Sequence, residues 1–223
     1  MEGIVLKSID YKEKSKLVYL YTPSGIEGVK ALDAARTKLG FTTTLNWVEY
    51  QKTQAKLPTV LEYHIKKSYY DFYADIKKIG VLMPMLDLLN HLEEDAPHAR
   101  IFPFFVTCLD ILMSTEEPRY VLSLFLIKML AVFGVRPVLN SCVRCQKIPP
   151  VSFSVSEGGA LCSSCTRENL KGQMLYQAFR YFYTTQDYTT MPKLELSYED
   201  VLDAIYQYYM HHANLKLKSY KLK

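Results

Sequence analysis

Apolar and polar residues alternate along the first third of the chain in short runs that are separated by turn-forming residues. Alternation with a period of two is typical of half-buried β-strands, and a cluster such as Pro23-Ser24-Gly25 indicates a turn. Short strands with no long helix between them favour a small closed barrel of the OB type. The five predicted strands are Gly3–Ile9, Leu17–Thr22, Val29–Ala35, Leu45–Gln51 and Thr59–Ile65.

From Ser68 onward the apolar positions recur every three to four residues, which is the period of an amphipathic α-helix. We expect Pro84 to kink or divide the first helix, and Gly134 to close the third. The predicted helical segments are Phe72–Leu92, a segment after Ala96-Pro97, Pro118–Phe133, Met174–Tyr183 and a last helix capped by Ser197 with Asp200. The apolar run around Lys128 is too short to span a bilayer, so we interpret it as a buried helix.

These patterns predict an α+β fold. Residues 1–68 would form a five-stranded OB-fold barrel that binds nucleic acid, and residues 69–213 an all-α domain that carries a four-cysteine zinc module at about 140–168. Residues 214–223 would form a basic tail.

The zinc module is predicted from two Cys-x-x-Cys pairs, Cys142 with Cys145 and Cys162 with Cys165, which sixteen residues separate. This spacing is typical of a site in which two tight turns present four thiolates to one tetrahedral ion. Alternation in Val151–Val155 and a turn at Glu157-Gly158-Gly159 predict a hairpin between the pairs. Four cysteines close the coordination shell, so we expect a structural Zn²⁺ and no metal catalysis.

Other roles for the cysteines have less support. Disulfides would need an oxidising compartment, and the N-terminus shows no apolar signal region. Redox chemistry usually needs a single Cys-x-x-Cys pair on a strand-to-helix turn. Arg144, Lys147 and Arg167 could offset the negative charge of the site, or could form an ordinary solvated rim.

The net charge of +4 is unevenly distributed. Residues 1–80 hold 13 basic and 9 acidic residues, residues 81–213 hold 10 and 14, and residues 214–223 hold 4 and none. The basic ends suggest a polyanionic partner, although charges of this size could also serve only solubility. The candidate nucleic-acid-binding residues are Lys12, Lys14, Lys16, Arg36, Lys38, Lys52, Lys56, Lys216, Lys218, Lys221 and Lys223.

Two aromatic residues of the barrel, Trp47 and Tyr50, could stack on bases, or could pack on the sheet surface. No catalytic frame is present: the sequence contains no phosphate-binding loop, no His-Glu-x-x-His and no Gly-x-Ser-x-Gly. His91-Leu92-Glu93 resembles part of a zinc deaminase signature, but Ser141 and Leu161 stand where that signature has proline. We therefore expect no enzyme, no small-molecule substrate and no membrane segment.

Several motifs, in order along nearly the whole chain, resemble the RecO family of bacterial recombination mediators. The N-terminal ones are Glu2-Gly3-Ile4-Val5-Leu6-Lys7-Ser8, Leu20-Tyr21-Thr22-Pro23, Ala34-Ala35-Arg36 and Leu57-Pro58-Thr59. The C-terminal ones are Phe133-Gly134-Val135-Arg136-Pro137, the two cysteine pairs with Gly158-Gly159-Ala160-Leu161 before the second, and Leu217-Lys218-Ser219-Tyr220-Lys221.

The resemblance implies an OB-fold, a helical domain and a zinc module. It further implies a cytoplasmic, nucleoid-associated protein that binds single- and double-stranded DNA and anneals complementary strands. With RecR, such a protein helps to load RecA onto DNA coated by single-stranded-DNA-binding protein. The family's longer basic linker is reduced here to Thr37-Lys38-Leu39-Gly40. An RNA-binding barrel and zinc-ribbon protein of translation, or a scaffold that binds no nucleic acid, remain open from the residues alone.

Overall fold

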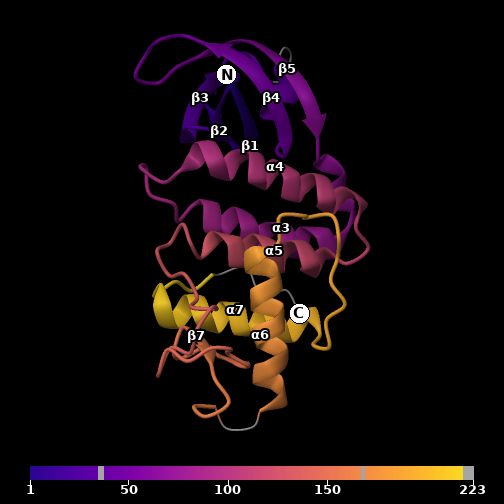
Figure 1. Ribbon diagram of the computed structural model, residues 1–223. Helices are drawn as coiled ribbons and strands as arrows, with labels where there is room; N and C mark the ends of the chain where they lie inside the picture. Colours follow the sequence, from indigo (N-terminus) through magenta and orange to yellow (C-terminus); the bar gives the residue numbers. More distant parts are fainter. Residues whose placement is uncertain (35–37, 167–168, 218–223) are drawn as a thin grey trace. The chain divides into compact units, whose positions relative to one another are not determined.

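The computed structural model describes residues 1–34, 38–166 and 169–217, and the chain forms two compact units. The first unit comprises Met1–Ile79 and Asn90–Met113. The second comprises Gly80–Leu89 and the chain from Ser114 onward. Figure 1 shows the strands of the first unit in indigo and violet and the last helices of the second unit in orange and yellow.

The first unit contains a five-stranded antiparallel sheet in the order β3-β2-β1-β4-β5. Its two outer strands are joined where Lys30 bridges Thr59 and the Lys30 N–H donates to the Pro58 carbonyl at 2.8 Å. The sheet therefore closes on itself in the connectivity of an OB-fold, and the predicted barrel is confirmed. The strands are β1 Glu2–Tyr11, β2 Ser15–Thr22, β3 Gly25–Ala31, β4 Asn46–Lys52 and β5 Val60–Ser68.

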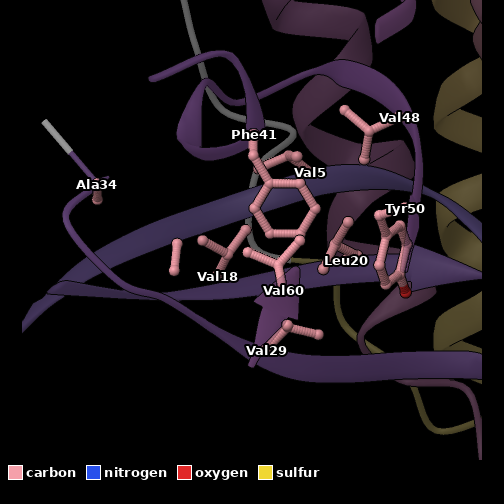
Figure 2. Close-up of a cluster of buried hydrophobic side chains, with 10 residues drawn as sticks. Val5, Val18, Leu20, Val29, Ala34, Phe41, Val48, Tyr50 and Val60 are labelled. Carbon is pink, nitrogen blue, oxygen red and sulfur yellow. The ribbon is translucent and has the colours of Figure 1, made fainter. Parts of the chain in front are cut away.

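The barrel core is built from the side chains that alternate inward along the strands. Val18 and Leu20 of β2 point into the core, whereas Leu17 and Tyr19, which alternate with them, stay only half-buried. The short helix α2, Leu39–Thr42, inserts Phe41, which is fully buried and packs edge-on against Tyr50 with 5.5 Å between ring centroids. Figure 2 shows Phe41 among the valines of this core. Burial of these side chains supplies the main stabilisation of the barrel.

The start of β3 differs from the prediction. The strand begins at Gly25, four residues before the predicted Val29, because the turn after β2 is a two-residue loop that pairs Thr22 with Gly25. Thr22 Oγ1 accepts from the Ser24 N–H at 3.1 Å and donates to the Gly25 carbonyl at 2.8 Å. Gly25 has φ +106°, a value that glycine adopts without strain.

Helix α4, His98–Ser114, belongs to the same compact unit as the barrel. Its Phe102 and Phe105 rings lie 5.9 and 6.0 Å from the ring of Tyr21 on β2. Tyr69 and Lys67 at the end of β5 donate to Asp110 of α4 at 2.7 and 2.6 Å. The compact unit thus extends beyond residue 68 and includes α4; the limits of the two domains stay a prediction.

A short 3₁₀ turn, η1 Tyr70–Ala74, precedes helix α3, Ile76–Leu89. Helix α3 continues through Pro84 as one element, so of the two predicted effects of this proline the division is wrong, and the kink stays a prediction. It also ends at Leu89, three residues before the predicted Leu92.

The second unit is built on helices α5 Pro118–Met129, α6 Leu170–Thr184 and α7 Tyr198–His212, and α5 packs against both of the others. Ser197 caps α7 by accepting from the Asp200 N–H, as predicted. Helix α5 ends four residues before the predicted Phe133, because 3₁₀-type turns follow Met129 before Gly134 reverses the chain at φ +72°. Helix α6 begins four residues before Met174, since Asn169 caps it.

Lys128 lies half-buried in the apolar helix α5, and its ammonium group has a defined role. Its Nζ donates to the carbonyls of Tyr183 at 2.9 Å and Thr185 at 2.6 Å, at the C-terminal end of α6. A cation at this end satisfies carbonyls that have no partner within the helix. Within the described residues, no helix is long and apolar enough to cross a membrane.

Candidate metal centre and nucleic-acid interface

The four cysteines of the two pairs converge in the second unit. The sulfur atoms of Cys142, Cys145, Cys162 and Cys165 all lie within 4.8 Å of one another. Cys145 Sγ is 3.5 Å from both Cys162 Sγ and Cys165 Sγ. Four sulfurs at about 2.3 Å from a tetrahedral ion are about 3.8 Å apart, so the cluster fits a Cys₄ metal site.

Each pair sits on a tight turn, as the spacing predicts. In the first turn the Gln146 N–H donates to the Cys142 carbonyl at 2.8 Å, and Gln146 has φ +61°. In the second turn the N–H groups of Cys165 and Thr166 both donate to the Cys162 carbonyl at 3.0 Å. These turns direct both sulfurs of a pair to the same side.

The predicted hairpin between the pairs is confirmed. It consists of β6, Ser152–Ser154, and β7, Gly159–Leu161. The backbone of the first pair joins it, since Val143 N–H donates to the Ala160 carbonyl at 2.9 Å. Gly159 is required there, because a Cβ at this position would lie 2.6 Å from the Val138 carbonyl oxygen.

Two helices support the hairpin. Phe153 of β6 stacks on Phe179 of α6 with 4.2 Å between centroids, and Tyr208 of α7 lies 6.1 Å from Phe153. His212 Nε2 is 2.6 Å from the Val155 carbonyl oxygen, and Tyr208 donates to the Gly158 carbonyl at 3.2 Å. The metal site is therefore tied to the helices through its insert.

The thiols differ in how readily they ionise. Burial favours the protonated form of Cys142, but the N–H groups of Cys162, Cys145 and Arg144 outweigh it and lower its pKa to about 6. Hydrogen bonds with Cys145 and Cys162 raise the pKa of Cys165 to about 12. A divalent cation bound among the four sulfurs would favour the thiolate form of all four cysteines.

Of the three cations that could offset this charge or form a solvated rim, Arg144 has defined partners: its guanidinium donates to the Glu157 carboxylate and, at 3.1 Å, to the Cys165 carbonyl. Lys147 is exposed, and Arg167 lies outside the described residues. Cys108, the fifth cysteine, is fully buried in α4, and burial raises the pKa of its thiol. Since the cluster consists of cysteines alone, His91 has no place in it.

The candidate lysines of the barrel have different surroundings. Lys12, Lys14 and Lys56 are exposed on the β1–β2 and β4–β5 loops. Lys16 Nζ lies 3.5 Å from Asp10 Oδ1 in an ion pair, and Lys38 Nζ donates to the Leu61 carbonyl at 2.5 Å. Lys52 is half-buried and forms an ion pair with Glu27, so its charge is already compensated. Lys216 is exposed, whereas Arg36, Lys218, Lys221 and Lys223 lie outside the described residues.

The side chains of the two candidate stacking residues, Tyr50 and Trp47, both make contacts within the barrel unit. Tyr50 is only 2% exposed and belongs to the core, so its ring offers no face to a ligand, and of its two predicted roles it has packing and not stacking. Trp47 is half-buried; its Nε1 donates to Glu2 at 3.0 Å, and Lys66 Nζ lies 4.1 Å from its ring centre.

The structure adds a surface that the sequence reasoning missed, the outer face of β1–β3. Lys7, Tyr19 and Gly28 pair across the three strands, with Lys7 Nζ 4.5 Å above the Tyr19 ring. Lys30 is on the same face and pairs with Leu17. In OB-folds this region and the loops beside it, here with Lys12 and Lys56, carry the ligand. The signal available in the sequence was the alternation of Tyr19 with the buried Val18 and Leu20.

Comparisons with known proteins cover both regions of the chain. The family model described as "Recombination protein O C terminal" matches residues 73–221, which include all four cysteines. The chain belongs to the RecO family. Proteins called DNA repair protein RecO from Halalkalibacterium halodurans and Bacillus subtilis are each 28% identical to it. Both alignments cover 98% of this chain and 91% of the relative.

The two comparisons complement each other. The RecO family model begins at residue 73 and thus covers helices α3 to α7 and the cysteine cluster, but not the strands of the barrel. The alignment with the RecO protein of Bacillus pumilus, 28% identical, spans 99% of this chain and 91% of the relative, so it includes the barrel as well. Similarity to RecO proteins therefore extends over both compact units.

Proposed function

We propose that this protein is a recombination mediator in DNA repair. It binds single- and double-stranded DNA and anneals complementary strands. With RecR it helps to load RecA onto DNA coated by single-stranded-DNA-binding protein. The observation that carries the proposal is the family membership, with relatives called DNA repair protein RecO that align over nearly the full chain. The protein acts without an enzymatic step, in the cytoplasm at the nucleoid.

The barrel supplies the means to hold DNA without reading its sequence. Exposed lysines on the two loops, Lys12, Lys14 and Lys56, can neutralise phosphates. The β1–β3 outer face offers Tyr19 beside Lys7 and Lys30. A cationic surface with an aromatic ring is suited to a single strand, because every base has a face that can stack. Shielding phosphate charge while leaving base edges free is what annealing of two strands requires.

The metal of the cysteine cluster is a structural Zn²⁺ in this proposal. Zinc prefers a tetrahedral set of thiolates, and the four sulfurs of Cys142, Cys145, Cys162 and Cys165 fill such a shell. The bound ion would stabilise the turns and the hairpin, and with all four positions taken by cysteine it supplies no catalysis. Zinc content measured on the purified chain tests this part directly, with one ion per chain expected.

An annealing assay on complementary single strands, with and without the strand-coating protein, tests the mediator function. The variant in which Lys12, Lys14 and Lys56 are all changed to alanine should anneal more slowly and bind every sequence more weakly. Each single-strand phosphate contact contributes about 0.7 to the slope of log affinity against log salt, so the slope should fall by about 2.

The matched control removes the same charge elsewhere: Lys77, Lys147 and Lys193, all exposed, are changed to alanine. A similar loss in the control, or a loss confined to certain sequences, contradicts the proposed interface. Stronger binding to RNA than to DNA of the same sequence favours a translation protein instead. Absence of binding and annealing at low salt contradicts the proposed function itself.

The basic tail is part of the same proposal. Leu217 is 6% exposed, and the Leu215 N–H donates to the Tyr209 carbonyl at 3.2 Å, so the tail is best removed after Leu217. Truncation there deletes Lys218, Lys221 and Lys223 and should lower DNA affinity and the salt slope. An unchanged slope would exclude the tail from the interface.

A further inference from the structure

We propose that Arg144 is a positioning residue of the metal centre, whose guanidinium links the two cysteine pairs and so determines how tightly the metal is held. This inference rests on the proposed metal site. Arg144 lies inside the first pair, between Cys142 and Cys145, but its side chain contacts the other two segments of the module.

The first contact is with the turn of the insert. Arg144 Nε and Nη2 each donate to one carboxylate oxygen of Glu157, both at 2.7 Å. Two parallel bonds of this kind fix the orientation of both side chains.

The second contact reaches the other cysteine pair. Arg144 Nη1 donates to the Cys165 carbonyl at 3.1 Å. The second pair lies before α6, which begins only at Leu170, and its own turn bonds are local. A side-chain bond from the first pair therefore restrains the position of Cys165 relative to Cys142.

A solvent-exposed ion pair alone would add little, and Arg144 is 55% exposed. The geometry predicts a larger effect on metal affinity than an exposed ion pair would give, because the same guanidinium also restrains the backbone of the candidate ligand Cys165. Groups that orient metal ligands commonly change metal affinity by about 10- to 100-fold. The expected effect is thus on metal affinity and release rate, and not on DNA contacts.

The test is competition for Zn²⁺ between the full chain and a chromophoric chelator, with three variants. Arg144→Ala should lower affinity by about tenfold or more and speed zinc release. Arg144→Lys keeps the charge but cannot form the paired bonds, so most of the loss should remain. Lys147→Ala removes a cation from the same turn and should stay within about twofold of wild type.

The absorption spectrum of the Co²⁺-loaded chain checks that four thiolates still bind in Arg144→Ala at saturating metal. Equal zinc affinity of Arg144→Ala and wild type overturns the proposal, as does full recovery by Arg144→Lys. An equal loss in Lys147→Ala would likewise show a general charge effect. A wild-type chain that binds no zinc instead contradicts the proposed metal site, so the two failures are distinguishable.

Discussion

The barrel and the cysteine module are stabilised in different ways. The barrel surrounds a continuous apolar core, whose members include Val5, Leu20, Phe41 and Val48. The buried cluster at the cysteine module consists of Leu161 with Cys142 and Cys162, against which Val143 and Cys165 pack, so three of its five members are candidate metal ligands. A small module with little apolar surface to bury needs another source of stability, whereas the barrel does not. In the proposed site a metal would therefore take the place of a core, and only in this region.

Removal of the metal should give the largest difference in stability between the barrel and the cysteine module. Cys145→Ser, or a strong chelator, should abolish stoichiometric zinc binding and expose the hairpin amides of β6 and β7 to hydrogen exchange. Because metal binding by structural zinc peptides is worth about 10–16 kcal/mol, its loss cannot be absorbed by the rest of the module. The amides of β1 and β2 in the barrel should keep their protection. Equal loss of protection in both regions would contradict the comparison.

A substitution in the barrel core should destabilise the barrel and leave the metal site unchanged. Phe41→Ala is expected to destabilise the barrel by about 3–5 kcal/mol, because a fully buried ring is removed and a cavity remains. Trp47, the single tryptophan of the chain, lies on β4, so its fluorescence during urea unfolding reports on the barrel. Zinc affinity should not change. A loss of zinc together with the loss of fluorescence would show that the barrel and the metal site do not unfold independently.

Within the second unit, Lys128→Met tests the polar contact between α5 and the end of α6, which the apolar pattern of α5 does not predict. The substitution keeps the length of the side chain but removes the donor to the Tyr183 and Thr185 carbonyls. We expect a loss of about 1–2 kcal/mol, measured by thermal unfolding followed by circular dichroism. Lys193→Met, at an exposed position, is the control. An unchanged or higher melting temperature for Lys128→Met would mean that burial of the ammonium group offsets its bonds.

The smallest expected effect is a change in alkaline stability. Burial raises the pKa of Tyr208 to about 12, above its ordinary value of about 10. Between these values the folded chain holds a proton that the unfolded chain has released, so stability is complete below pH 10 and falls as pH rises toward 12. Tyr208→Phe should weaken this fall. The control Tyr70→Phe changes a side chain that is 53% exposed and should leave the pH profile as it is.

Much of the fold could be predicted from local patterns. The alternation around Val18 and Leu20 located β2, and Ser197 with Asp200 located the start of α7, because these signals depend on neighbouring residues alone. The start of β3 could not be placed in the same way. It depends on how Thr22 and Gly25 close the hairpin, and the sequence Pro23-Ser24-Gly25 is compatible with a longer turn.

The candidate site also has one part that the sequence could predict, the cysteine cluster, and one part that it could not, the surroundings of the lysines. The spacing of the cysteines was sufficient to predict their convergence, since a Cys-x-x-Cys pair places both sulfurs on one turn. The binding role of the lysines was harder to predict, because a sequence shows which residues are charged but not which residues they pair with. Lys52 has Glu27 beside it from a strand far away in sequence, whereas Lys12 and Lys56 have remained exposed.

The sequence by itself determined the barrel, the helices and the four cysteines that could hold a metal, since each follows from a short-range period or spacing. Only the tertiary structure decided that Tyr50 is a core residue, that Arg144 reaches Glu157 and Cys165, and that Lys7, Tyr19 and Lys30 share one face. The physical reason is that burial and pairing join residues from different strands and loops, and no periodicity along the chain encodes which distant residues will meet.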